Sequence, residues 1–209
     1  MPRVSTAFKE DKRVEILEAA RRCVARSGFH QASMHDICAE AGMSPGNLYR
    51  YFPSKEAIIA GIAERDRAEV GAQLAAAEFT DDFFATFAAL ARHHLVERSA
   101  DDVGLCAEMV PESRRNPAIG RIMQDFDAEV RTLLIAMLRA AAERGEIRAD
   151  VDFENVVTML MVIADGVWWR RAVEPDFDAE AVLPIFMDLT RHMLLGGPPK
   201  DNKNGGTRS

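Results

Sequence analysis

The chain of 209 residues is 48% hydrophobic, which excludes a disordered chain and allows one large buried core or two small ones. Charged residues interrupt every apolar run before it reaches membrane-spanning length, and the N-terminus lacks the apolar segment of a signal peptide, so we expect a cytoplasmic protein with no membrane contact. The net charge of −7 is uneven: residues 1–67 contain 11 Lys and Arg against 9 Asp and Glu, and residues 68–200 contain 13 against 23, which disfavours phosphate contact outside the N-terminal part.

The spacing of apolar residues predicts an all-α fold with about nine helices. We expect a flexible arm over residues 1–8 and a first helix over 9–26, which Gly28 ends. Two short helices are predicted within 33–52. A long helix and five further helices are then expected, in chain order, over residues 54–77, 81–98, 102–110, 117–144, 152–172 and 178–195.

Breaker residues mark the ends of two of these segments. Pro111 is expected to stop the helix over 102–110, because proline in a helix interior removes a hydrogen bond and clashes with the preceding turn. The C-terminal residues 196–209 are rich in Gly, Pro and Asn, so we predict that they are disordered.

Residues 33–52 have the local signals of a helix, a tight turn and a second helix. Ser33 can cap the first helix, and an acidic residue three positions later is close to a capping box. Gly42 suits the left-handed turn that ends a helix, and Ser44 followed by Pro45 suits the start of the next one. This layout is typical of a helix-turn-helix DNA reader, in which the second helix enters the major groove.

The run from Ile16 to Glu56 resembles the N-terminal domain of TetR-type transcriptional regulators. The segments that carry the resemblance are ILEAA (16–20), SGF (27–29), SMHDI (33–37), AGMSPGNLYRYF (41–52) and SKEA (54–57). Tyr51 departs from the pattern, because many members have histidine there, but it keeps an aromatic hydrogen-bond donor. The resemblance implies a three-helix DNA-binding domain over residues 9–56 and a larger helical ligand-binding and dimerisation domain over 57–195.

The resemblance also implies which residues contact a double-stranded, palindromic DNA operator. Those expected at base edges are Pro45, Gly46 and Asn47, the last through an amide that can read adenine. Those expected at phosphates are Ser33, Ser44, Tyr49, Tyr51 and Lys55, and His35 and Arg50 are expected at either. Each also has an ordinary structural alternative: the two serines are helix caps whether or not DNA is bound, Tyr49 can pack partly in the core, and His35 can simply face solvent.

The rest of the chain is expected to dimerise and to bind a ligand. The resemblance implies a homodimer through the last two helices, whose apolar residues are Val156, Leu160, Ile163, Val167, Val182, Ile185, Phe186, Leu189 and Met193. A body rich in Met and Phe suits an adaptable cavity for a small lipophilic effector. The candidate ligand-binding residues are Phe84, Phe87, Met109, Phe126, Met161, Asp165, Trp168 and Trp169. The alternatives are that the apolar ones are plain core and that Asp165 pairs with Arg171.

The sequence shows no catalytic motif, cofactor motif or convincing metal site. His93, His94 and Glu97 lie on one predicted helix, but no second ligand pair has matching spacing. Three cysteines are too few for a disulfide framework. We therefore expect a DNA-binding regulator and not an enzyme, in the first place a repressor released from its operator by a lipophilic molecule, controlling efflux-pump or related genes. The alternative is a DNA-binding architectural protein without a small ligand.

Overall fold

The computed structural model describes residues 6–77, 82–174 and 176–196, and these residues form nine α-helices, one short π-helix and no strand. The predicted all-α fold is thereby confirmed. No helix in the described ranges is both long and apolar enough to cross a membrane. The elements are α1 (Thr6–Ser27), α2 (Met34–Glu40), α3 (Pro45–Leu48), α4 (Lys55–Ala77), α5 (Phe83–Arg92), η1 (His93–Glu97), α6 (Ala100–Ser113), α7 (Pro117–Glu143), α8 (Phe153–Val173) and α9 (Ala179–Leu195).

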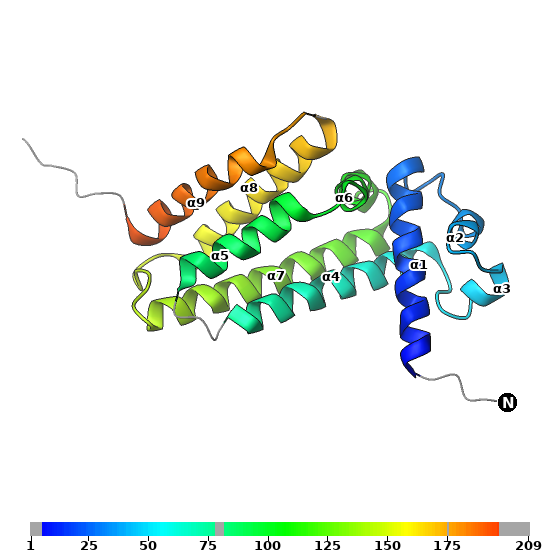
Figure 1. The fold of residues 1–209 in the computed structure, drawn as a ribbon, viewed down its shortest axis with the longest axis horizontal. Coiled ribbons are helices and arrows are strands. Elements are labelled where there is room, and N and C mark those ends of the chain that lie inside the picture. The colour runs from blue at the N-terminus through cyan, green and yellow to red at the C-terminus, as the bar shows by residue number, and fades with distance from the viewer. Residues whose placement is uncertain (1–5, 78–81, 175, 197–209) are drawn as a thin grey trace, which may run out of the picture.

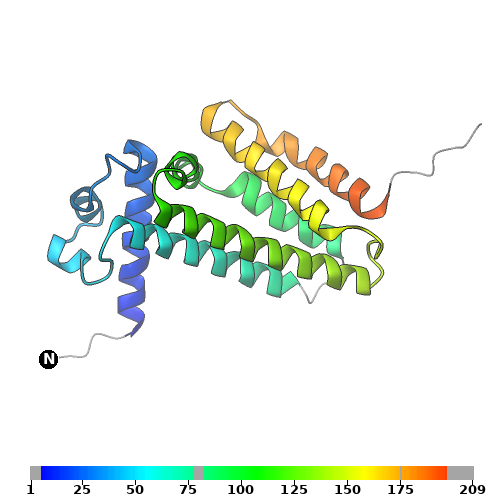
Figure 2. The ribbon, with the colours of Figure 1, turned by 180° about the vertical axis from the view of Figure 1, so that it is seen from behind.

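The helices form a small N-terminal unit and a longer helical body (Figure 1). The small unit consists of α1, α2 and α3, and α1 crosses the long helices of the body steeply. In the body, α4 and α7 run side by side in both views, α8 packs against α7, and α9 packs against α8 on the far side of the bundle from α4 (Figure 2). α6 sits at the junction and packs against α1, α7 and α8.

Two apolar cores hold these parts together, and α4 extends from the first toward the second. The first core contains Leu17, Ile37 and Leu48 of the small unit, together with Ile58 near the start of α4 and Ile119 near the start of α7. The second core lies in the body, between α5, α7, α8 and α9. Because the first turns of α4 and α7 are built into the first core, a displacement of either helix is felt by the small unit.

The helix boundaries differ from the prediction at three places. α1 begins at Thr6, so residues 6–8 are helical and not part of an arm; the rest of the predicted arm and residues 197–209 lie outside the described residues. Pro111 does not end its helix, because α6 continues to Ser113. The proline is exposed and lies two residues from the helix end, so only a short stretch of helix follows it. The predicted helix over 81–98 is α5 followed by the π-helical turn η1.

The last two helices bury part of the apolar set assigned to the dimer interface, whereas Ile185 and Leu189 of that set are exposed. Four of the residues assigned to a dimer interface, namely Val156, Leu160, Val167 and Phe186, are buried in the core of the single chain. Apolar spacing alone cannot tell which stripe faces the chain's own core. The large exposed apolar side chains of this region are Met159, Val162, Trp169 and Val173 on α8 and Ile185, Leu189 and Leu195 on α9.

Candidate DNA-binding surface and ligand cavity

The helix-turn-helix predicted over residues 33–52 is present, and local interactions explain its geometry. Ser33 and Asp36 form a capping box at the start of α2, in which the Ser33 Oγ accepts from the Asp36 N–H at 3.1 Å and the Ser33 N–H donates to the Asp36 carboxylate at 2.9 Å. Gly42 adopts a φ of 63°, the left-handed conformation expected of the turn. The buried side chains of Ile37 and Leu48 then fix α2 against α3.

The single helical turn of α3, continued by turn residues 49–51, points its polar side chains outward. Leu48 and Phe52 are buried, whereas Tyr49 is 53% exposed and Arg50 is exposed as well. A Cβ built at Gly46 would meet no atom within 4 Å, so the protein's own packing does not require glycine there. Its small size leaves the backbone accessible to another molecule. Tyr51 is half-buried and packs partly against the first core.

The two candidate serines differ in what their hydroxyl groups already bind. The Ser33 hydroxyl donates to the Asp36 carboxylate at 2.6 Å, so a phosphate at this position would have to compete with a neighbouring negative charge. Ser44 occupies the N-cap of α3, as expected, but its side chain makes no capping hydrogen bond. The exposed hydroxyl of Ser44 is therefore available to bind another group. A role as a helix cap alone accounts for Ser33 better than for Ser44. His35 is exposed on α2.

Lys55 is turned toward the protein in this structure. Its Nζ donates to the backbone carbonyl of Phe29 and lies 4.3 Å from the centroid of the Phe29 ring. Burial of the ammonium group lowers the pKa of Lys55 below its ordinary value. Lys55 thus holds the loop after α1 against the start of α4, and it must leave this carbonyl to reach a phosphate.

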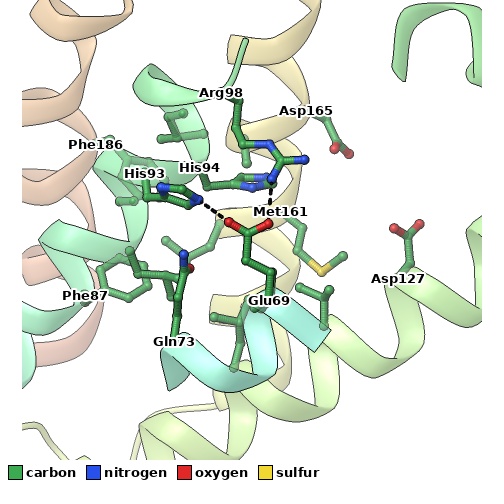
Figure 3. Close-up of a pocket in the computed structure, with 18 of the residues that line it drawn as sticks. Glu69, Gln73, Phe87, His93, His94, Arg98, Asp127, Met161, Asp165 and Phe186 are labelled. Carbon is green, nitrogen blue, oxygen red and sulfur yellow. Dashed lines mark hydrogen bonds and ion pairs between the residues drawn. The ribbon is translucent and has the colours of Figure 1, made fainter. Parts of the chain in front are cut away.

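A cavity of about 140 Å³ lies in the body between α4, α5 with η1, α7 and α8, and Phe186 of α9 also reaches it (Figure 3). Four of the predicted ligand-binding residues line it: Phe87, Phe126, Met161 and Asp165. An apolar wall with a few converging polar groups is the usual composition of a small-molecule site. The polar residues of the wall that the sequence did not single out for ligand binding are Glu69, Gln73, His93, His94, Arg98 and Asp127.

The other four predicted ligand-binding residues do not line this cavity. Met109 is buried in the first core, next to the small unit. Phe84 is buried in the second core, where the guanidinium of Arg191 lies 4.1 Å from its ring centroid. Trp168 packs behind the wall, with its ring centroid 5.1 Å from that of His94, and Trp169 is 58% exposed on α8.

A chain of ion pairs runs from the small unit to the cavity wall. Arg21 of α1 is 5% exposed and pairs with both Asp66 of α4 and Asp102 of α6. Both carboxylates also pair with Arg98, which follows η1, at 3.1 and 3.5 Å. Although burial alone would lower the pKa of Arg98, its carboxylate partners raise it above the ordinary value. This arginine is therefore charged at any physiological pH.

This series of ion pairs ends at Glu69 in the cavity wall. The Glu69 carboxylate accepts from Arg98 at 3.2 Å and lies 2.9 Å from the Nε2 atom of His93 (Figure 3). His93 also approaches Glu97 at 3.3 Å, but in the described part of the chain no group of three His, Cys, Asp or Glu side chains is placed to hold a metal ion. The cysteines Cys23, Cys38 and Cys106 are free thiols.

Comparison with protein families matches both parts of the chain. Residues 16–62 match the family described as bacterial regulatory proteins, tetR family, and residues 88–195 match the C-terminal domain of BetI-type transcriptional repressors. The transcriptional regulator UidR of Escherichia coli K12 is 30% identical over 159 residues, which is 74% of this chain and 79% of that protein.

Solved structures give the same likeness over nearly the whole length. GusR of Salmonella enterica superposes with a TM-score of 0.77 and 27% identity, covering 92% of this chain and 99% of that one. A transcriptional regulator from Saccharomonospora viridis, solved in complex with choline, superposes with a TM-score of 0.73 at 23% identity, covering 88% of this chain and 98% of that one; at this identity the likeness concerns the fold.

Proposed function

This chain belongs to the TetR family of DNA-binding transcriptional regulators, and from that membership we propose that it is a homodimeric repressor released from its operator by a small organic effector. One observation carries the proposal: α4 begins in the core of the helix-turn-helix unit and continues into the cavity wall. Ile58 and Ile59 of α4 pack in the first core, and Glu69 and Gln73 line the cavity. A single helix therefore joins the DNA-reading surface to the ligand cavity.

The proposed DNA-reading surface is the exposed side of α2 and α3. At the start of α3, the residues proposed to contact base edges are Pro45, Gly46 and Asn47. Those proposed to bind phosphates are Ser44 and Tyr49. The exposure of Ser44, Pro45, Gly46 and Tyr49 and the open space at Gly46 support this assignment, while Asn47 is half-buried. Further DNA contacts at the edges of this surface are proposed for His35, Arg50 and Tyr51. Ser33 and Lys55 are also proposed to contact DNA, after each has broken its present hydrogen bond within the protein.

The proposed dimer interface is the exposed apolar face of α8 and α9. Val162, Trp169 and Ile185 are 57%, 58% and 61% exposed, which is unusual for side chains of this size on a folded chain. Pairing this face with a second copy around a two-fold axis would cover it and would present two recognition helices to two half-sites.

The ion-pair chain is the proposed route of coupling between effector and DNA. An effector in the cavity contacts the wall that contains Glu69 and Arg98, and Arg98 shares both carboxylate partners of Arg21 in α1. A shift of α4 or η1 therefore changes the position of α1 and, through it, the spacing of the two recognition helices. A coupling free energy of about 1–3 kcal/mol between the two sites would be sufficient to release DNA.

Substitutions on the recognition surface test the proposed contacts. Tyr49→Ala is expected to weaken binding to all DNA sequences by a similar factor, because it removes a phosphate contact; the phenol is uncharged, so the salt dependence of affinity is expected to change little. Asn47→Ala is expected to relax specificity at one base position with little change in the salt dependence. Fluorescence anisotropy on operator variants at several salt concentrations measures both effects. Unchanged affinity and specificity in both variants would contradict the assignment.

Lys55→Ala and Lys55→Met both remove the ammonium group, and two readouts, operator affinity and thermal stability, separate its two candidate roles. If Lys55 binds phosphate, both variants lose operator affinity by a similar factor. If it only holds the Phe29 loop, both retain affinity at low temperature and lose thermal stability, which a melting curve detects. Control of efflux-pump genes stays a prediction, which transcript levels in a deletion strain would test.

A further inference from the structure

Two carboxylates in the cavity wall form no ion pair with any described residue. Asp127 of α7 and Asp165 of α8 face each other beside Met161 (Figure 3). Neither makes an ion pair or hydrogen bond with any residue that the structure describes. The nearby arginines are engaged elsewhere: Arg131 donates to Thr158 at 2.8 Å, and Arg171 donates to the backbone carbonyls of Leu95 and Arg98. The Asp165–Arg171 pair considered from the sequence does not form.

The protein around these carboxylates disfavours their negative charge. Burial raises the pKa of Asp165, and burial together with the charge of Asp165 raises the pKa of Asp127, while the charge of Arg131 offsets part of that rise. A positive charge between the two would offset both the lost hydration and the mutual repulsion. Both side chains are still exposed on one side, so a molecule from solution can reach them.

Among the described residues, the remaining polar groups of the wall include a free acceptor and no free cation, although the buried Arg98 Nε donor also lacks a hydrogen bond. The Oε1 atom of Gln73 is buried without a hydrogen-bond partner in the described chain. His94 is enclosed by protein and opens on the cavity, with no hydrogen-bond partner among the described residues, and burial lowers its pKa to about 4, so the ring is neutral at neutral pH. Arg98 and His93, the cationic candidates, are held by Glu69.

The volume of the cavity and its apolar lining determine which ligands can fit it. At about 140 Å³ the cavity is close to the size of one that holds a single benzene ring. The rings of Phe87 and Phe126 and the thioether of Met161 line it, and aromatic faces attract organic cations as well as apolar groups. The preferred occupant is therefore compact, apolar over most of its surface and positively charged at one end.

We propose that the effector of this protein is an organic ammonium ion with N–H donors and an apolar body about the size of one ring, whose charged end lies between Asp127 and Asp165. This assignment rests on the proposed function, because it names the ligand class of the same cavity. Anionic ligands are disfavoured, since the wall would place two uncompensated carboxylates against them.

Isothermal titration calorimetry of the full-length protein with benzylammonium tests the assignment. Benzyl alcohol is the neutral probe of similar shape, benzoate is the anionic probe, and benzyltrimethylammonium carries the charge without N–H donors. Benzylammonium is expected to bind at least about tenfold more tightly than each of the other three, the loss that follows from removing one charge-assisted hydrogen bond. Absence of benzylammonium binding, or equal binding of the alcohol or benzoate, would overturn the proposal. Equal binding of benzyltrimethylammonium would overturn the part assigned to N–H donors.

Two variants and a matched control test whether Asp127 and Asp165 bind the ammonium group. Asp127→Asn and Asp165→Asn are each expected to weaken benzylammonium binding by about tenfold and to leave benzyl alcohol binding unchanged. Asp125→Asn removes the same charge from an exposed position on α7 and is expected to change neither. Unchanged benzylammonium affinity in both cavity variants, or an equal loss in Asp125→Asn, would contradict the site.

Failure of this assignment is distinguishable from failure of the proposed function. If a neutral or anionic compound binds the cavity and releases DNA, the protein is still a ligand-controlled regulator and only the ammonium class is wrong. If benzylammonium binds through Asp127 and Asp165 but no compound changes DNA binding, the ligand class stands and the regulatory proposal fails.

Discussion

Arg21→Ala is expected to destabilise the protein by about 3 kcal/mol, because it leaves Asp66 and Asp102 half-buried beside each other with one of their two cationic partners removed. Urea unfolding followed by circular dichroism measures this loss. The substitution also interrupts the ion-pair chain between α1 and the cavity wall. In the fraction that stays folded, an effector is therefore expected to lose much of its influence on operator affinity.

Arg22→Ala is the matched control, because the neighbouring arginine pairs with Glu40 at the surface and exposed ion pairs contribute little to stability. It is expected to change the unfolding midpoint only slightly and to leave the response to effector intact. If Arg21→Ala were no more destabilising than Arg22→Ala and responded normally to effector, the buried ion pairs would have neither of the roles assigned to them.

Ile185→Glu is expected to convert the proposed dimer into monomers and to lower operator affinity on the order of a hundredfold. The side chain is 61% exposed on the apolar face of α8 and α9, so glutamate is tolerated in the monomer but places a charge in the proposed interface. A monomer presents one recognition helix, and the gain from binding two half-sites at once is lost. Light scattering after size exclusion gives the mass, and anisotropy gives the affinity.

Val110→Glu is the control for this prediction, because Val110 is 52% exposed on α6 and lies outside the proposed interface. It is expected to leave both mass and operator affinity unchanged. A dimeric Ile185→Glu variant with normal affinity would show that the two chains pair through another surface or that pairing is not needed for binding.

The DNA-binding part was predictable because its signals are local. The capping box at Ser33, the left-handed turn at Gly42 and the serine–proline start of α3 each act within a few residues, and all three appear where the sequence places them. What the sequence could not give is the hydrogen-bonding state of the side chains. The inward turn of Lys55 depends on Phe29, which is 26 residues away in the chain.

The cavity was only half predictable because its wall is assembled from six helical elements. Aromatic and methionine content indicated an adaptable body, but helical spacing does not distinguish core from cavity, so Met109 and Phe84 were grouped with Phe87 and Phe126. Asp127 has no sequence signal of its own, because its importance comes from facing Asp165 across two helices. The ion-pair chain likewise joins residues as far apart as 21 and 102.

The most direct test of ligand-controlled repression is a gel shift of the purified protein on the DNA that flanks its own gene, with and without a panel of organic cations, neutral compounds and acids. We expect a specific shift that at least one compound abolishes, with benzylammonium-like cations first among them. A specific shift that no compound releases would contradict control by an effector and favour a ligand-free architectural role. Absence of any specific shift would contradict the DNA-binding assignment for that site.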